Sequence, residues 1–274
     1  MPLTNPIALA SGVLPEFSPQ VTARAAIAAG YDAVGLWVEP DRWTPTTTAE
    51  VRAILADSAL TVLDVEVVWL QPGRLDERHL GIIDVGRELG AANVLVVSSD
   101  PDDAGTAEKF AALCAHAGTD LRIALEFGIF TAVRTIGQAA AILARVDHPA
   151  AALLIDPIHL ARSGGDPSEV AALPRQLLAY AQFCDAGPLD YDLGDAKAVI
   201  AEAIDGRLLP GDGILPLGAL LAALPIGLPL SIELRSKALR DAYPDATDRA
   251  VALARATRGF LERQQGDAAR RPVI

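Results

Sequence analysis

The stretch LRIALEF, residues 121–127, and the stretch ALLIDPIH, residues 152–159, decide the fold. Each is a short aliphatic run that ends in an acid, and a helical pattern over residues 131–146 separates them. Such runs are typical of parallel strands, because helices cover both faces of a parallel sheet. The two stretches therefore predict consecutive strands joined by a helix.

The same alternation extends along the whole chain and gives eight apolar runs. They are Ile7–Ala10, Ala33–Trp37, Thr61–Val68, Asn93–Ser98, Leu121–Glu126, Ala152–Asp156, Ala179–Cys184 and Pro229–Leu234. Eight strands that alternate with helices predict a single-domain α/β fold, the (β/α)8 or TIM barrel. An open doubly wound sheet normally carries a glycine-rich turn after its first strand, and SGVLPEF, residues 11–17, offers none.

Helical patterns fill most of the intervening segments, and several begin with a Ser, Thr or Asp that can cap free amides. They cover Ser18–Ala29, Thr47–Ser58, Asp76–Leu89, Ala104–Ala117, 131–146, 167–178 and Thr247–Arg263. We expect a barrel over residues 1–264 and a flexible C-terminal tail over 265–274.

Composition narrows the class of protein. The formal charge of −12 argues against nucleic acid or an anionic membrane as a partner. The start of the chain lacks the pattern of a signal peptide, and prolines interrupt the apolar run 208–232, so we expect loop, short helix and strand there. Cys114 and Cys184 show no metal or disulfide spacing, which favours a reducing, cytoplasmic location.

Polar residues end the last four predicted strands. They are Glu126, Asp156, Gln182 and Glu233. Because strand C-termini meet at one mouth of a barrel, these oxygens should converge and hold one divalent cation, Mg²⁺ or Mn²⁺. In the plainer interpretation each acid caps a helix or pairs with an Arg. Four such residues together favour the metal, since acids crowded into one mouth repel one another.

Several of these segments resemble one family, the xylose-isomerase-like TIM barrels, and within it the sugar phosphate isomerase/epimerase group. The segments are YDAVGLW (31–37), ALEF (124–127), LLIDPIHLARSGGDP (153–167), AQFCDA (181–186), GRLLPGDGILPL (206–217) and SIELRS (231–236). The resemblance implies that Glu126, Asp156, Gln182 and Glu233 are the metal ligands and that His159 contacts substrate. Epimerases usually carry His where Gln182 stands. A glutamine there is similar to one branch of the bacterial 3-dehydroshikimate dehydratases.

Other residues near strand ends are candidates for substrate contact. Trp37 and Trp69 would form an apolar wall, Glu66 would point into the mouth or meet an Arg, and Asp185 would orient a ligand or cap a turn. Arg207, with the loop 210–213, would bind a carboxylate or phosphate over the site. Each of these also has an ordinary packing interpretation.

The leading functional hypothesis is a metal-dependent sugar isomerase or epimerase. The metal would polarise a carbonyl and stabilise a metal-bound enediolate, while Glu126 and Glu233 remove and return the proton and His159, with a pKa near neutrality, assists. A first alternative is a lyase of the 3-dehydroshikimate dehydratase type, and a second is a metal-free barrel that binds a small ligand. DNA repair of abasic sites would need more histidines than the four present. Barrels of this kind often pair through outer helices, so a homodimer fits the resemblance.

Overall fold

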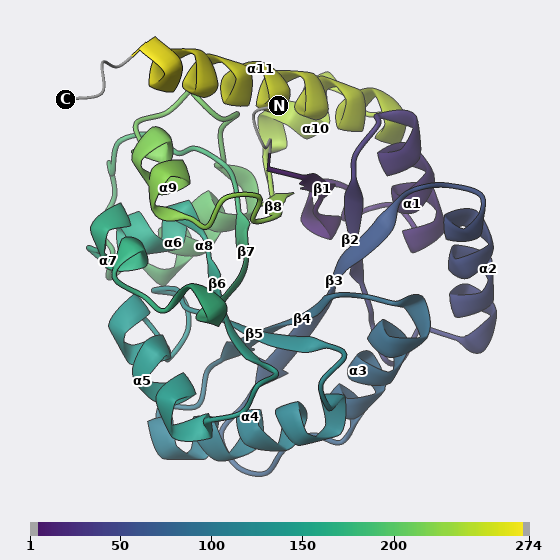
Figure 1. Ribbon diagram of the computed structural model, residues 1–274, viewed down its shortest axis with the longest axis vertical. Helices are drawn as coiled ribbons and strands as arrows, with labels where there is room; N and C mark the ends of the chain where they lie inside the picture. Colours follow the sequence, from purple (N-terminus) through teal and green to yellow (C-terminus); the bar gives the residue numbers. More distant parts are fainter. Residues whose placement is uncertain (1–4, 271–274) are drawn as a thin grey trace.

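The eight expected strands form a closed parallel barrel in the computed structural model, which describes residues 5–270 (Figure 1). The strands are β1 Ile7–Leu9, β2 Ala33–Trp37, β3 Thr61–Leu70, β4 Asn93–Ser98, β5 Arg122–Glu126, β6 Ala151–Ile155, β7 Leu178–Gln182 and β8 Leu230–Ile232. They follow one another around the barrel in chain order, and β1 pairs with β8 from Ile7 opposite Leu230 onward. The predicted (β/α)8 fold is confirmed.

Helices surround the barrel in a ring. They are α1 Pro19–Ala28, α2 Pro45–Ala56, α3 Arg78–Leu89, α4 Asp103–Ala117, α5 Ile136–Val146, α6 Pro157–Arg162, α7 Pro167–Ala171, α8 Ala196–Asp205, α9 Leu217–Ala223, α10 Lys237–Ala242 and α11 Ala246–Arg270, with short 3-10 turns at Ser11–Val13 and Arg175–Leu177. Side-chain caps from Ser18, Thr44 and Thr135 start three of them. Figure 1 shows α11 lying across the side of the barrel where the first and last strands meet.

The sequence predicted the long helices better than the short ones. The helix expected over 167–178 is broken into α7 and a 3-10 turn, because Pro174 lies between them and has no amide hydrogen to donate. The short helices α6, α8 and α10 were not anticipated. The run 208–232 contains a loop, α9 and β8, as expected.

The C-terminal segment differs from the expected tail. Helix α11 continues past residue 264 as far as Arg270. The remaining part of the predicted tail, residues 271–274, lies outside the described residues.

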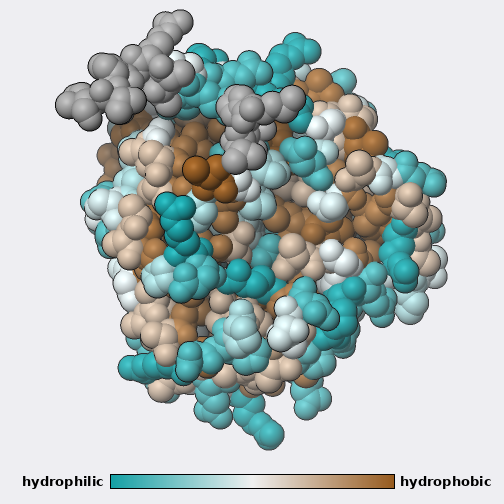
Figure 2. All heavy atoms as spheres, in the orientation of Figure 1, coloured by the Kyte–Doolittle hydropathy of each residue, from teal (hydrophilic) through white to brown (hydrophobic). Residues whose placement is uncertain are grey.

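The core has two layers. The larger one fills the space between strands and helices, and a smaller one fills the barrel interior with Ala8, Leu95, Ala124, Leu154 and Tyr180. Small and aliphatic interior residues leave the polar side chains to gather at one end of the barrel. On the face shown in Figure 2, hydrophobic and hydrophilic side chains are interspersed.

Two further expectations concern the cysteines and membrane-spanning helices. Cys114 and Cys184 are both buried and free, as the lack of disulfide spacing predicted. Within residues 5–270, none of the helices combines the length and the apolar character that a membrane crossing requires.

Candidate active site

Five strands bring acidic and amide side chains to the C-terminal end of the barrel. Glu66, Glu126, Asp156, Gln182 and Glu233, which we call the mouth cluster, are all buried. They lie on or directly after β3, β5, β6, β7 and β8. Alternation along each strand points these side chains inward. The four predicted ligands therefore come together with Glu66 in one enclosed place.

Arg207 lies inside this cluster rather than over it. Its Nη1 donates to Asp156 Oδ2 at 2.5 Å, its Nη2 lies 3.1 Å from Glu233 Oε2, and its Nε donates to the Ala203 carbonyl at 2.8 Å. The guanidinium is almost fully buried, with 3% of the residue exposed. Arg207, which we expected to bind a carboxylate or phosphate over the site, is thus a fixed countercharge for two of the acids, and the alternative of an exposed Arg in a turn is wrong as well.

Asp156 performs both ordinary tasks that the plainer interpretation foresaw. Its Oδ1 caps α6 by accepting from the amides of Ile158 at 2.7 Å and His159 at 3.2 Å, and its Oδ2 accepts from Arg207. Burial opposes its ionisation, yet the charge of Arg207 together with these hydrogen bonds lowers the pKa of Asp156. Asp156 is therefore an anion.

Glu126 and Gln182 are in the opposite situation. Glu126 Oε1 and Gln182 Oε1 are buried and accept no hydrogen bond within the described residues. Burial, and then the charges of Glu233 and Asp156, raise the pKa of Glu126 well above its ordinary value. Acceptor oxygens without donors are rare in protein interiors. This pair therefore fits a cation better than it fits a purely structural network.

A divalent metal fits the donor set of the cluster. One oxygen or nitrogen each from Glu126, Asp156 and His159 lies within 4.8 Å of the other two, which is close enough for a shared ion. Carboxylate and amide oxygens suit hard cations, and a nearby imidazole also suits zinc. Arg207 neutralises part of the charge, and the unpartnered oxygens of Glu126 and Gln182 remain for the metal.

His159 lies beside the strand-end acids, as predicted, but its pKa differs from the expected value. It sits in the first turns of α6, with Nε2 3.8 Å from Asp156 Oδ2, and its ring packs against Phe130 at a centroid distance of 4.9 Å. Burial lowers the pKa of His159 to about 4, against the opposing charge of Asp156. The expected pKa near neutrality is corrected, and the ring is neutral at pH 7.

Glu66 and Asp64 form an acidic pair on one face of β3. Ser11 donates a short hydrogen bond to Glu66, and burial followed by the charge of Asp64 raises the pKa of Glu66 to about 7. Burial also raises the pKa of Asp64 to about 6. We predicted Glu66 but missed Asp64, although two residues apart in a strand share a face.

Asp185 caps a turn, which is one of the two roles expected for it. Its carboxylate accepts from the amides of Ala186 at 2.9 Å, Gly211 at 3.0 Å and Leu215 at 2.9 Å. Asp185 thus fixes the loop 210–213, and a Cβ at Gly213 would lie 2.4 Å from its Oδ1. The loop also packs on α11 through Gly211, so the expectation of substrate contact by Asp185 is corrected to a turn-holding role.

The two tryptophans lie on different sides of the mouth. Trp69, 39% exposed, donates to Ser99 at 2.8 Å and meets Phe130 edge-on at 6.2 Å. Trp37, 37% exposed, lines a large hollow beside the cluster. Phe130 was missed because it lies in an irregular loop after β5, where no periodicity marks it.

Comparison with known proteins agrees with this architecture. The model of the family described as xylose isomerase-like TIM barrel matches residues 23–257. The chain belongs to this family. Its resemblance, predicted from the strand-end segments, is confirmed.

Relatives of this xylose isomerase-like barrel include both longer and similar-sized proteins. A 3-dehydroshikimate dehydratase of Pseudomonas putida is 30% identical over 85% of this chain, but the match covers only 38% of that protein. This barrel thus spans about two fifths of that curated relative. A solved fusion of a xylose isomerase-like TIM barrel with a 4-hydroxyphenylpyruvate dioxygenase is 24% identical, with a TM-score of 0.78, over 99% of this chain and 46% of the fusion. A structure of the IolI protein with a bound zinc atom is 16% identical, with a TM-score of 0.80, over 94% of this chain and 99% of the other.

Proposed function

We propose that this barrel is a divalent-metal-dependent lyase that removes water from a cyclic hydroxy-ketone acid of the 3-dehydroshikimate type. The observation that carries the proposal is the pair of buried, unpartnered oxygens on Glu126 and Gln182 beside the Arg207-bound acids. The dehydratase relative of Pseudomonas putida and the glutamine on β7 favour dehydration over epimerisation. This reverses the order in which the sequence alone ranked the two reactions.

The residues that would hold the metal are Glu126, Asp156, Gln182 and Glu233. When bound, the ion would polarise the ketone and stabilise negative charge on its oxygen. Mg²⁺, Mn²⁺ and Zn²⁺ all remain suitable for this donor set, and the neighbour with a zinc atom supports including zinc.

The chain's own side chains would move the protons. A carboxylate of the mouth cluster takes the proton from the carbon next to the ketone, and the electrons of that C–H bond form a carbon–carbon double bond. The hydroxyl one carbon further leaves as water with a proton from a protonated carboxyl of the same cluster. Arg207 keeps Asp156 ionised and holds Glu233 in place through two of its nitrogens. His159, fixed by Phe130 on one side and Asp156 on the other, is placed to guide the leaving hydroxyl.

Isomerisation or epimerisation of a ketose is the second candidate. Glu126 on β5 and Glu233 beyond β8 come from strands that are not neighbours, so they approach the cluster from different directions. Such a pair can take a proton on one side of a carbon and return it on the other. The same residues would therefore serve both reactions, and the substrate decides between them.

The test compares the two reactions on one preparation. The purified chain is stripped with EDTA, reloaded separately with Mg²⁺, Mn²⁺ or Zn²⁺, and given 3-dehydroshikimate or ketoses in deuterated water. We expect water loss, seen as the absorbance of the aromatic product, with at least one reloaded ion and not after EDTA. Deuterium uptake into a ketose without water loss would select the isomerase, and activity that EDTA leaves unchanged would overturn the metal-dependent function.

A variant extends the same test. Glu233→Gln should lose both metal and turnover, while Glu88→Gln, an exposed acid on α3, should keep both. Equal metal content in wild type and Glu233→Gln would remove Glu233 from the ligand set.

A further inference from the structure

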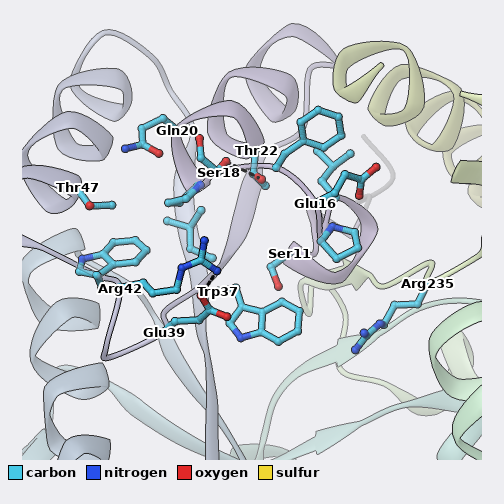
Figure 3. A pocket seen from close by; sticks show the side chains of 16 residues that line it. Ser11, Glu16, Ser18, Gln20, Thr22, Trp37, Glu39, Arg42, Thr47 and Arg235 are labelled. Carbon is cyan, nitrogen blue, oxygen red and sulfur yellow. Dashed lines mark hydrogen bonds and ion pairs between the residues drawn. The ribbon is translucent and has the colours of Figure 1, made fainter. Parts of the chain in front are cut away.

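A large hollow adjoins the mouth cluster on the side of β1 and β2. Its volume is about 760 Å³, and the loops after β1 and β2 form most of it, together with Arg235 from beyond β8 (Figure 3). Phe17, Trp37 and Trp43 contribute apolar surface. A hollow of this size accepts a substituted ring or a short sugar chain.

The hollow and the cluster share a boundary. Ser11 lines the hollow and donates to Glu66 of the cluster. A Cβ at Gly12 would lie 3.0 Å from the Arg235 side chain and 3.1 Å from Glu233 Oε1. Only the backbone of Gly12 therefore lies between Arg235 in the hollow and Glu233 in the cluster. A molecule that reacts at the cluster and extends into the hollow therefore passes Arg235, whose side chain borders Glu233.

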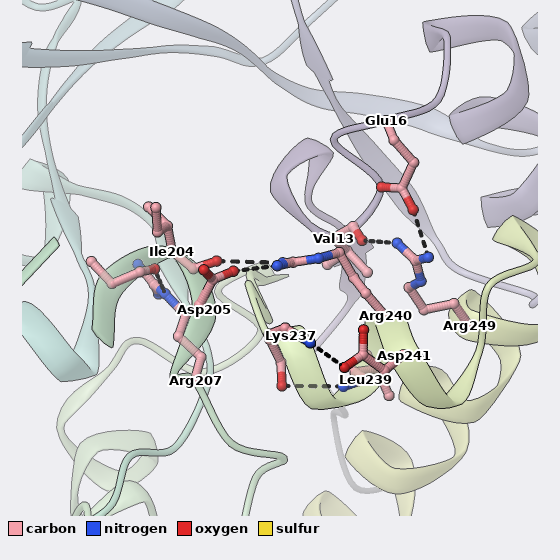
Figure 4. A network of polar contacts seen from close by, with 12 residues as sticks. Val13, Glu16, Ile204, Asp205, Arg207, Lys237, Leu239, Arg240, Asp241 and Arg249 are labelled. Carbon is pink, nitrogen blue, oxygen red and sulfur yellow. Dashed lines mark hydrogen bonds and ion pairs between the residues drawn. The ribbon is translucent and has the colours of Figure 1, made fainter. Parts of the chain in front are cut away.

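Most charges in the hollow are already paired. Arg42 donates to Glu39 at 2.8 Å, and Glu16 accepts from Arg249 at 2.6 Å (Figure 4). Arg249 also donates to the Val13 carbonyl at 3.0 Å, which ties the wall of the hollow to α11. These four charged groups thus form two neutral ion pairs that hold the wall of the hollow in place.

Arg235 is different. Within residues 5–270 its guanidinium makes no ion pair, and its Nε is buried without an acceptor. Its Cζ lies 5.7 Å from the ring centroid of Trp37, and Figure 3 shows it standing apart from the Arg42–Glu39 pair. Burying a donor without an acceptor is costly, and a guanidinium matches a carboxylate or phosphate with two parallel hydrogen bonds.

We propose that Arg235, above the face of Trp37, binds an anionic group, a carboxylate or a phosphate ester, on the part of the substrate that extends into the hollow. The inference rests on the proposed function in taking the mouth cluster as the reacting centre. Arg207, whose three nitrogens are all engaged, cannot serve this purpose without releasing its acids. The hollow thereby selects substrates by charge.

The experiment uses two pairs of probes that differ only in charge. They are 3-dehydroshikimate with its methyl ester, and fructose 6-phosphate with fructose. Each is titrated calorimetrically into the full chain after EDTA treatment, a form in which we expect none of the probes to react, so that the readout is affinity rather than turnover. We expect one charged probe to bind at least about tenfold more tightly than its neutral partner. A preference in the first pair would show that the subsite binds a carboxylate, and a preference in the second pair would show that it binds a phosphate.

Variants assign that preference to Arg235. Arg235→Gln should abolish it and leave the affinity of the neutral partner unchanged, and Arg235→Lys should retain part of it. Arg145→Gln, an exposed arginine in the last turn of α5, removes the same charge elsewhere and should retain all of it. A preference that survives Arg235→Gln, or the absence of any preference in both pairs, overturns the inference.

Turnover of the same probes separates this inference from the proposed function. Charge preference that depends on Arg235, without reaction of any probe, supports the subsite and sinks the dehydration. Water loss with equal affinity for the charged and neutral probes supports the dehydration and overturns the anion subsite.

Discussion

The two halves of the barrel mouth are built in opposite ways. On the side of β5 to β8, Arg207, Asp156, Glu233 and His159 are buried and hold one another in fixed positions. On the side of β1 and β2, a hollow of about 760 Å³ is lined by half-exposed aromatic rings and by Arg235. The difference teaches that the proposed reacting centre is preorganised while the proposed recognition surface is roomy, so one can vary without the other.

Removal of the central arginine should give the largest effect. Arg207→Met leaves Asp156 and Glu233 buried without their countercharge, so we expect a loss of about 3–5 kcal/mol in the free energy of unfolding. Urea denaturation in EDTA measures it. Added divalent cation should reduce the loss, because it neutralises the same carboxylates. A loss no greater than that of Arg145→Met would show that the closed half is not held by charge.

Loss of the unpartnered acid should affect chemistry more than folding. Glu126→Gln keeps the shape but removes the group that can accept a proton and bind a cation as a carboxylate, and we expect kcat to fall roughly 10²–10³-fold, or about 3–4 kcal/mol. Metal content, measured by elemental analysis, should fall with it. An unchanged rate would contradict the assignment of this half to catalysis.

Neutralising Asp64 should stabilise the protein in a pH-dependent way. The pKa of Asp64 is about 6 in the folded chain, against 3.8 when it is free. The folded state therefore holds the proton more tightly, and stability falls as pH rises through this interval. At pH 8 Asp64→Asn should be more stable than wild type by about 3 kcal/mol.

Near pH 4 residue 64 carries almost no charge in either folded protein, so most of the advantage of Asp64→Asn should vanish. Urea denaturation of metal-free protein at the two pH values tests this. A gain of equal size at pH 4 would mean that packing, and not charge, is responsible.

Substitution of the two tryptophans should give the smallest effects, and the kinetic constant that changes should differ between the two halves of the mouth. Trp37→Leu removes the aromatic surface under Arg235. We expect KM to rise by about one order of magnitude with kcat nearly unchanged, which corresponds to a loss of about 1 kcal/mol in substrate binding. Trp69→Leu removes a contact to Phe130, which packs on His159, and should lower kcat several-fold instead. Steady-state kinetics on both variants distinguishes them, and identical profiles would remove the division.

The sequence predicted the framework of the site because each ligand ends a buried strand. Glu126, Asp156, Gln182 and Glu233 follow apolar runs whose period and length identify the strands, and barrel closure brings such ends together. Asp64 was detectable in principle, since it shares a face of β3 with Glu66 two residues away. Arg235 follows Glu233 by two residues just beyond β8.

Other features depend on tertiary contacts that no local pattern records. Arg207 follows α8, a helix that the sequence did not reveal, and its insertion between Asp156 and Glu233 depends on where that helix ends. Ser11 lies in a three-residue 3-10 turn and Phe130 in an irregular loop. The acidity of His159 was misjudged because complete burial is a property of the folded barrel.

The hydrogen bonds from Arg249 to Val13 and Glu16 join the first loop of the barrel to its final helix. During translation the loop leaves the ribosome long before that helix exists. These contacts at the wall of the hollow thus form only after every residue of the mouth cluster has been synthesised. A nascent chain halted after β8 would carry the full set of acids and still lack a formed entrance for its substrate.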